Sequence, residues 1–98
     1  MTITETRKDT ELTIVLNGRL DTITAPDLDR EIHSSLADVT ALTFDLAGLT
    51  YISSAGLRIL LSAQKLMNKQ GTMTVRNVQP EIMEIFAMTG FDEILIIE

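Results

Sequence analysis

The stretch FDLAGLTYISSAGLRILL, residues 44–61, joins two patterns that decide the fold. Within ALTFDL (41–46), Leu42, Phe44 and Leu46 fall on one face, which predicts a strand. From Ser54 to about residue 70 the spacing of apolar residues is helical, and Gly71 is a natural stop. The stretch therefore predicts a strand that leads directly into a helix.

The same reading along the chain predicts the order β-β-α-β-α-β-α-β. Helices between strands require right-handed crossovers, so we expect a mixed, mostly parallel sheet of about five strands and an α/β fold. Thr24 is the expected cap of the first helix. The apolar run at 94–97 favours a strand covered on both faces. The remaining expected elements are strands at 2–7, 11–18, 72–77 and 93–98, a helix spanning Leu28, Ile32 and Leu36, and a helix from Pro80 to Gly90.

Composition narrows the classes of function. The 98 residues predict a single domain, 1–98, and 45% of them are hydrophobic. The net charge of −6, with no cluster of lysine or arginine, argues against nucleic-acid or anionic-membrane binding and favours a protein partner. Neither a membrane span nor a secretory signal is present, which predicts a cytoplasmic protein.

Metal and cofactor chemistry have little support in the sequence. There are no cysteines, and the single histidine, His33, falls inside a predicted helix without a second histidine. We therefore expect no metal site and no cofactor. A glycine-rich phosphate loop is also missing, so an enzyme is not expected.

The predicted helix from Ser54 carries two apolar stripes. One contains Leu57, Leu60, Leu61 and Met67, and the other contains Ile59, Ala63 and Leu66. A helix on a sheet usually needs one stripe. Either the C-terminal helix covers the second stripe, or part of it meets a partner.

Three interpretations compete for Ser53 and Ser54. A serine at a helix start commonly caps an orphan amide, which stabilises the helix by about 1 kcal/mol. Nucleophilic catalysis requires a base, and no suitable base accompanies these serines. Phosphorylation would place about −1.5 to −2 charges at the positive end of a helix dipole, where they are tolerated. Capping and phosphorylation are compatible with each other.

Three segments together resemble the bacterial anti-sigma factor antagonists of the STAS domain family. They are GRLDTITAPDL, FDLAGLTYISSAGLRILL and VQPEIMEIFAMTGF, in the order and spacing of that family. The resemblance covers nearly the whole chain and implies a small sheet with helices packed mainly on one side. The central segment, with Asp45 before the Ser-Ser-Ala-Gly-Leu motif, is the most specific.

The resemblance also implies a mechanism. The unphosphorylated antagonist binds an anti-sigma factor that is a serine kinase, and a sigma factor is released. The kinase then phosphorylates one serine of the antagonist with ATP, and a serine phosphatase resets the cycle. Ser54, two residues before Gly56, matches the modified serine. Many members have aspartate where this chain has Ser53, so Ser53 is the less favoured site.

The expected partner-binding residues follow from the resemblance and from strand direction. Loops after parallel strands emerge at one edge of a sheet, where open α/β folds place ligands. The set is Asp21, Thr22, Thr24, Ser53, Ser54, Ala55, Gly56, Leu57 and Arg58. The alternative is a STAS interaction subunit of a transporter-associated or sensing complex, in which no serine is modified.

Overall fold

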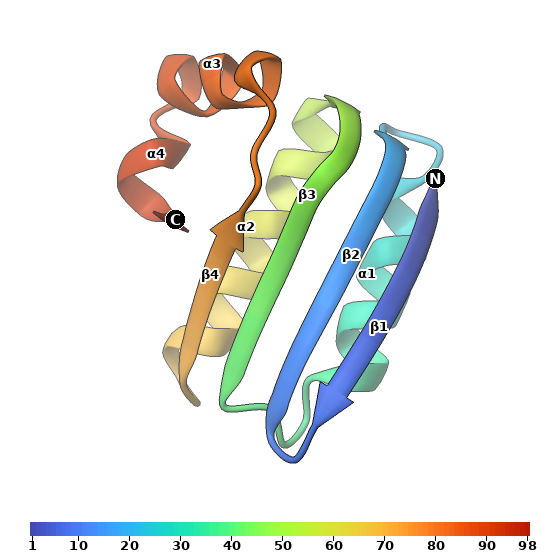
Figure 1. The fold of residues 1–98 in the computed structure, drawn as a ribbon, viewed down its shortest axis with the longest axis vertical. Helices are drawn as coiled ribbons and strands as arrows, with labels where there is room; N and C mark the ends of the chain where they lie inside the picture. Colours follow the sequence, from blue (N-terminus) through green and yellow to red (C-terminus); the bar gives the residue numbers. More distant parts are fainter.

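The computed structural model describes residues 1–98 and is built around one five-stranded sheet (Figure 1). The strands lie in the order β1-β2-β3-β4-β5. The first pair is antiparallel and the other pairs are parallel, which confirms the expected mixed, mostly parallel sheet. In chain order the elements are β1 (Thr2–Lys8), β2 (Glu11–Leu20), α1 (Ala25–Ser35), β3 (Ala41–Ile52), α2 (Ser54–Asn68), β4 (Thr72–Arg76), α3 (Pro80–Thr89), α4 (Phe91–Ile94) and β5 (Ile96–Ile97).

The helices α1 and α2 cover one face of the sheet, and α3 and α4 follow beyond the C-terminal end of β4 (Figure 1). Alternate residues of the central strands point toward α1 and α2, so Ile14, Leu16 and Phe44 are fully buried. Gly71 follows α2 closely, and a Cβ there would lie 1.9 Å from the carbonyl oxygen of Thr40. The predicted helix stop is therefore also a point of close backbone contact.

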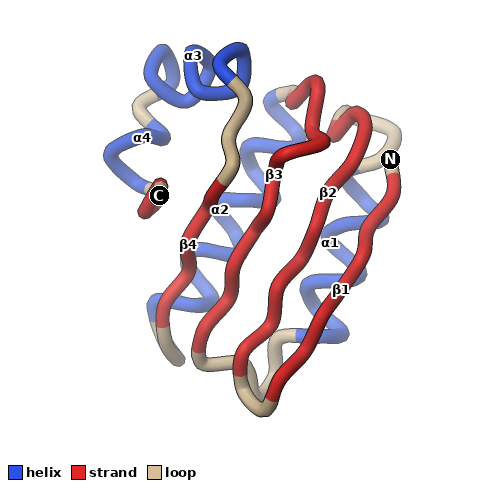
Figure 2. Tube along the Cα trace, in the orientation of Figure 1, coloured by secondary structure: helices blue, strands red, loops and turns tan.

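The two central strands are longer than the sequence predicts. β2 runs to Leu20 and β3 runs to Ile52, whereas we expected them to end at residues 18 and 46. Register shifts between residues 15 and 19 of β2 accommodate the extension. At Gly48 a Cβ would lie 1.8 Å from Oδ1 of Asn17, so a larger residue there would require the exposed Asn17 side chain to move. Figure 2 shows that β3 bends near its C-terminal end.

The C-terminal segment differs from the prediction. Gly90 ends α3 in the left-handed conformation (φ 79°), and the chain then forms the short helix α4. Only Ile96 and Ile97 pair with β4. Ile94 is 44% exposed and Ile96 is 54% exposed, so the expected strand covered on both faces is wrong. No helix is long and apolar enough to cross a membrane.

The second apolar stripe of α2 is covered by α1, not by the C-terminal helix. α1 and α2 pack against one another. Ala63 is buried, while Ile59 and Leu66 are half-buried against the core. Ile59 and Leu66 lie near the two ends of the α1–α2 interface, where the surface is hollowed.

Candidate functional site at the carboxyl edge of the sheet

The junction between β3 and α2 places the two serines in different roles. Ser53 is the N-cap in an extended conformation, and its Oγ accepts a 3.3 Å hydrogen bond from the amide of Gly56. Ser54 is the first residue of α2 and is exposed. The Ser53 side chain is the one that accepts a hydrogen bond from a first-turn amide of α2. Capping therefore belongs to Ser53, and the Ser54 hydroxyl faces solvent.

The loop from Asp21 to Thr24, which joins β2 to α1, is held by side chains. Oδ1 of Asp21 accepts hydrogen bonds from the amides of Ile23 and Thr24, both at 3.0 Å. Oγ1 of Thr24 donates to the carbonyl of Arg19 at 2.8 Å and accepts from the amide of Asp21 at 2.9 Å. Thr24 occupies the N-cap position of α1, as predicted, but the expected side-chain cap bond is not made. The Asp21 carboxylate bonds to amides that precede α1, and its backbone carbonyl accepts a 2.8 Å hydrogen bond from the amide of Ala25, the first residue of the helix.

The environment of Asp21 favours its ionised form. The hydrogen bond from the Thr24 amide, supported by the Thr24 hydroxyl, the Ile23 amide and the charge of Arg19, holds the pKa of the Asp21 carboxyl below its usual value. Nε of Arg19 lies 3.8 Å from Oδ2 of Asp21. The same guanidinium stacks 4.1 Å above the ring centroid of Tyr51 on β3. The first residue of the loop therefore carries an ionised carboxylate held in place by its hydrogen bonds.

The two junctions meet at one edge of the sheet. The amide of Ser53 donates a 2.9 Å hydrogen bond to the carbonyl of Leu20, the last residue of β2. Parallel pairing of β2 with β3 brings their C-terminal ends together, where α1 and α2 both begin (Figure 1). The predicted juxtaposition of the loop at 21–24 with the serines is confirmed.

The expected partner-binding residues divide by exposure. Thr22, Ser54 and Arg58 are exposed, while four others are half-buried at the same edge: Asp21, Thr24, Ser53 and Ala55. Gly56 and Leu57 are buried, so these two do not offer a contact surface. A Cβ on Gly56 would lie 2.7 Å from Cγ of Leu20. Both residues instead fix the start of α2 against the sheet.

An open groove of about 270 Å³ lies between the first turns of α1 and α2. Its lining combines some of the expected partner-binding residues with others that the sequence analysis did not identify. The lining residues are Thr22, Ala25, Pro26, Asp29, Ala55, Arg58 and Ile59. Ala55 and Arg58, from the first turns of α2 that Ser54 begins, are part of this lining.

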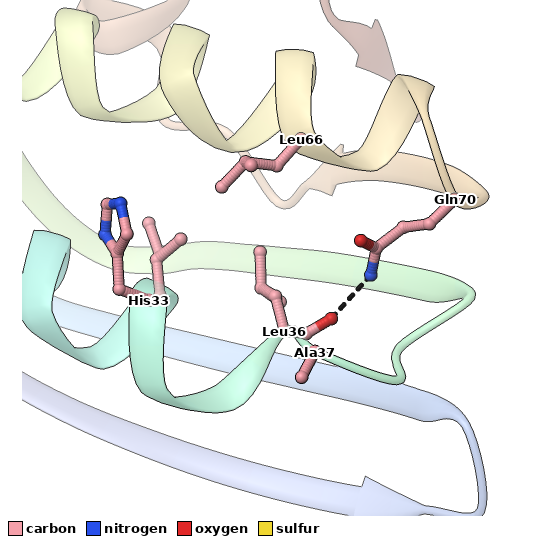
Figure 3. A pocket seen from close by; sticks show the side chains of 6 residues that line it. His33, Leu36, Ala37, Leu66 and Gln70 are labelled. Carbon is pink, nitrogen blue, oxygen red and sulfur yellow. Dashed lines mark hydrogen bonds between the residues drawn. The ribbon is translucent and has the colours of Figure 1, made fainter.

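A smaller hollow of about 140 Å³ lies between the C-terminal parts of α1 and α2, at the opposite end of their interface. Figure 3 shows the side chains that line it. Its lining includes Leu36, Leu66 and Gln70. Nε2 of Gln70 donates to the carbonyls of Leu36, at 2.5 Å, and Val39, at 2.6 Å. That amide ties the end of α2 to the end of α1, which gives the hollow a structural role.

Sequence reasoning did not identify Ile23, which is 85% exposed in the middle of the loop. The sequence did contain a signal for it. Ile23 is an aliphatic residue between two threonines, and it fits neither the alternation of the preceding strand nor the helical spacing that follows. No group of three or more histidine, cysteine or acidic side chains is placed to hold a metal ion. Nδ1 of His33 lies 2.8 Å from the carbonyl oxygen of Asp29, on the surface of α1.

Comparison with known proteins agrees with this architecture. The family model for the STAS domain matches residues 2–98, and the chain belongs to the STAS domain family. A Bordetella bronchiseptica protein assigned as an anti-sigma factor antagonist, BtrV, is 33% identical over 93 residues. The match covers 93% of this chain and 80% of BtrV.

Solved structures give the same fold. An anti-sigma factor antagonist from Mycobacterium paratuberculosis is 27% identical, with a TM-score of 0.89, covering 98% of this chain and 83% of that one. The Bacillus cell fate determinant SpoIIAA in its phosphorylated form is 17% identical, with a TM-score of 0.78. That match covers 99% of this chain and 91% of SpoIIAA. At this identity the likeness to SpoIIAA concerns the fold alone.

Proposed function

We propose that this chain is an anti-sigma factor antagonist regulated by phosphorylation of Ser54. In the unphosphorylated state it binds an anti-sigma factor that is a serine kinase, which frees a sigma factor. The kinase phosphorylates Ser54 with ATP in the cytoplasm and then dissociates, and a serine phosphatase restores the binding state. The chain itself acts by binding and has no catalytic role in the cycle.

The observation that carries this proposal is the position of Ser54. It is exposed, it begins α2, and a separate residue, Ser53, supplies the cap. A kinase can therefore reach the Ser54 hydroxyl without breaking the structure of the junction. The first-turn amides and the positive end of the helix dipole favour an anionic group at this position. Membership of the STAS family and the antagonist relatives support the same role.

The expected effect on binding follows from charge. Phosphate on Ser54 would add about −1.5 to −2 charges at the same edge as the loop from Asp21 to Thr24. Unless new cations meet that charge in a closed interface, its burial costs several kcal/mol, and each 1.4 kcal/mol is tenfold in affinity. Phosphorylation should therefore weaken the complex by orders of magnitude while the fold persists.

The test uses the kinase partner, ATP and calorimetric titration. We expect tandem mass spectrometry to find one phosphate, on Ser54, and none on the Ser54→Ala variant. Ser54→Ala should bind like the wild type, because it removes the acceptor hydroxyl and adds no charge, whereas Ser54→Asp should bind poorly. Phosphate found only on Ser53 would refute the assignment. Equal affinity for all three proteins would favour the interaction-subunit alternative, in which no serine is modified.

A further inference from the structure

Ile23 is the most exposed of the large hydrophobic side chains, at 85%, and it lies in the loop between β2 and α1. Met88 on α3 is similarly exposed, at 82%. Single exposed apolar residues are common on protein surfaces, so exposure alone carries no inference. The conformation of the loop and the surface beside it distinguish Ile23 from Met88.

The backbone on both sides of the Ile23 side chain is fixed. The Asp21 carboxylate accepts hydrogen bonds from the amides of Ile23 and Thr24. The Thr24 hydroxyl donates to the carbonyl of Arg19 and accepts from the amide of Asp21. These bonds hold the loop in one conformation while leaving the Ile23 side chain in water. A side chain presented by a rigid backbone loses less conformational entropy when it is buried by a partner.

The surface next to Ile23 has the anatomy of a protein interface. Thr22 lines the groove between α1 and α2, and the lining also includes the apolar residues Ala55 and Ile59. Asp29 and Arg58 bring one negative and one positive charge to its lining. Protein interfaces typically combine an apolar centre with a polar, charged rim. Ile23 follows Thr22 in the chain and Ser54 precedes Ala55, so Ile23 and Ser54 each lie directly beside a residue that lines the groove.

We propose that Ile23 is the apolar anchor of this surface and inserts into a pocket of the anti-sigma factor partner; this inference rests on the proposed function. The partner pocket must be apolar, and the groups around it must complement Arg58 and Asp29. Buried side chains in well-packed pockets near the centre of an interface contribute most of the binding energy. Ile23 then supplies affinity that does not depend on charge, whereas Ser54 supplies the switch.

The experiment compares two equally exposed aliphatic side chains. The purified serine-kinase anti-sigma factor is titrated calorimetrically into unphosphorylated wild type, Ile23→Ala and Met88→Ala. Both side chains are in water in the free protein, so thermal melts of all three should coincide. We expect the Kd to rise at least tenfold for Ile23→Ala and to change less than twofold for Met88→Ala. An unchanged Kd for Ile23→Ala, or an equal loss for Met88→Ala, would overturn the anchor.

A parallel titration of Ser54→Asp separates this inference from the proposed function. If Ser54→Asp fails to bind while Ile23→Ala binds normally, the anchor is wrong and the phosphorylation switch stands. If wild type does not bind the kinase, both are wrong. Sedimentation of the chain alone tests a second copy as the occupant. A dimer that Ile23→Ala dissociates would assign the side chain to self-association and overturn the partner pocket.

Discussion

The two strand-to-helix junctions at the carboxyl edge of the sheet are held in different ways. Between β2 and α1, the Asp21 carboxylate and the Thr24 hydroxyl satisfy several backbone groups around Ile23. Between β3 and α2, one serine, Ser53, makes a single 3.3 Å cap bond. The first junction is braced by polar side chains, and the second has only one such brace.

The second junction is positioned mainly by close packing beneath it. Gly56 lies so near Leu20 and Ile52 that a Cβ would come within 2.7 Å and 2.9 Å of their side chains. The amide of Ser53 is tied to the carbonyl of Leu20. This arrangement fixes the start of α2 from the core side and leaves Ser54 open to solvent. A rigid loop suits display of a side chain, whereas an open helix start suits chemical modification.

The largest stability effect is expected from Gly56→Ala. The added methyl group would overlap Leu20 and Ile52, and overpacking of this kind costs about 1–3 kcal/mol. For a domain of this size, each kcal/mol lowers the melting temperature by about 4–8 °C. The matched control is Ser54→Ala, two residues away and exposed, which should stay within about 0.5 kcal/mol of wild type. Equal unfolding curves for both variants would mean that packing does not hold this junction.

Much of the fold could be predicted because apolar periodicity and helix-ending glycines act locally. The chain order of the elements as far as α3, the mostly parallel pairing and the starts of α2 and α3 follow from such signals. The extension of β3 to Ile52 could not be predicted, because it depends on the register shifts of β2 and on the contact of Asn17 with Gly48. These are contacts between segments distant in sequence.

The C-terminal segment shows a different limit. Its apolar run resembles a buried strand, but the left-handed turn at Gly90 leads into a second short helix. In that arrangement Leu95 is buried, and Ile94 and Ile96 on either side of it are substantially exposed. The predicted strand does form, but only as the two-residue β5. Local propensity overestimated its length and burial because tertiary packing decided which side chains to bury.

The next largest stability effects are expected from removing the side chains that brace the two junctions, Asp21 and Ser53. Asp21→Ala removes the acceptor of two amides, whereas Ser53→Ala removes the acceptor of one. The loss of an N-cap serine costs about 0.5–2 kcal/mol. We expect Asp21→Ala to lower the melting temperature more than Ser53→Ala, as measured by circular dichroism. The reverse order would show that the serine cap, not the carboxylate, is the stronger brace.

The candidate site could be predicted only in part from the sequence. Strand direction correctly placed the loop at 21–24 beside Ser53 and Ser54. Which side chains remain accessible could not be deduced, since the burial of Gly56 and Leu57 depends on the strands beneath α2. The sequence also could not show that Ser53 caps α2 while Ser54 remains free, because this depends on the extended backbone conformation of Ser53 (φ −96°, ψ 174°).

A smaller effect of opposite sign is expected from Ser53→Asp. Aspartate caps a helix about as well as serine, and its charge at the N-terminus of α2 should add about 0.3–1 kcal/mol of stability at low salt. The matched control, Ser34→Asp, puts the same charge near the C-terminal end of α1 and should destabilise slightly. Urea unfolding at low and high salt measures both, and the difference should shrink as salt screens the dipole. Equal shifts for the two variants would contradict the dipole argument.

The smallest effect concerns acid, which should loosen only the first junction. Hydrogen bonds to the carboxylate hold the folded pKa of Asp21 below the unfolded value of about 3.9. Its stabilising contribution is therefore complete well above pH 3.9 and is lost as the pH falls through the folded pKa. Protonation makes the carboxyl a weaker acceptor for the amide of Thr24, whereas Ser53 carries no titrating group.

Amide hydrogen exchange by NMR distinguishes the two junctions in a single sample. After correction for intrinsic exchange, the protection of the Thr24 amide should fall as the pH is lowered below about 3.9, and that of the Gly56 amide should not. In Asp21→Asn, which keeps an acceptor oxygen but does not titrate there, the protection of Thr24 should no longer depend on pH. If the two amides of wild type lost protection together, acid would be acting on the whole domain. The carboxylate would then not be a separate brace of the loop that presents Ile23.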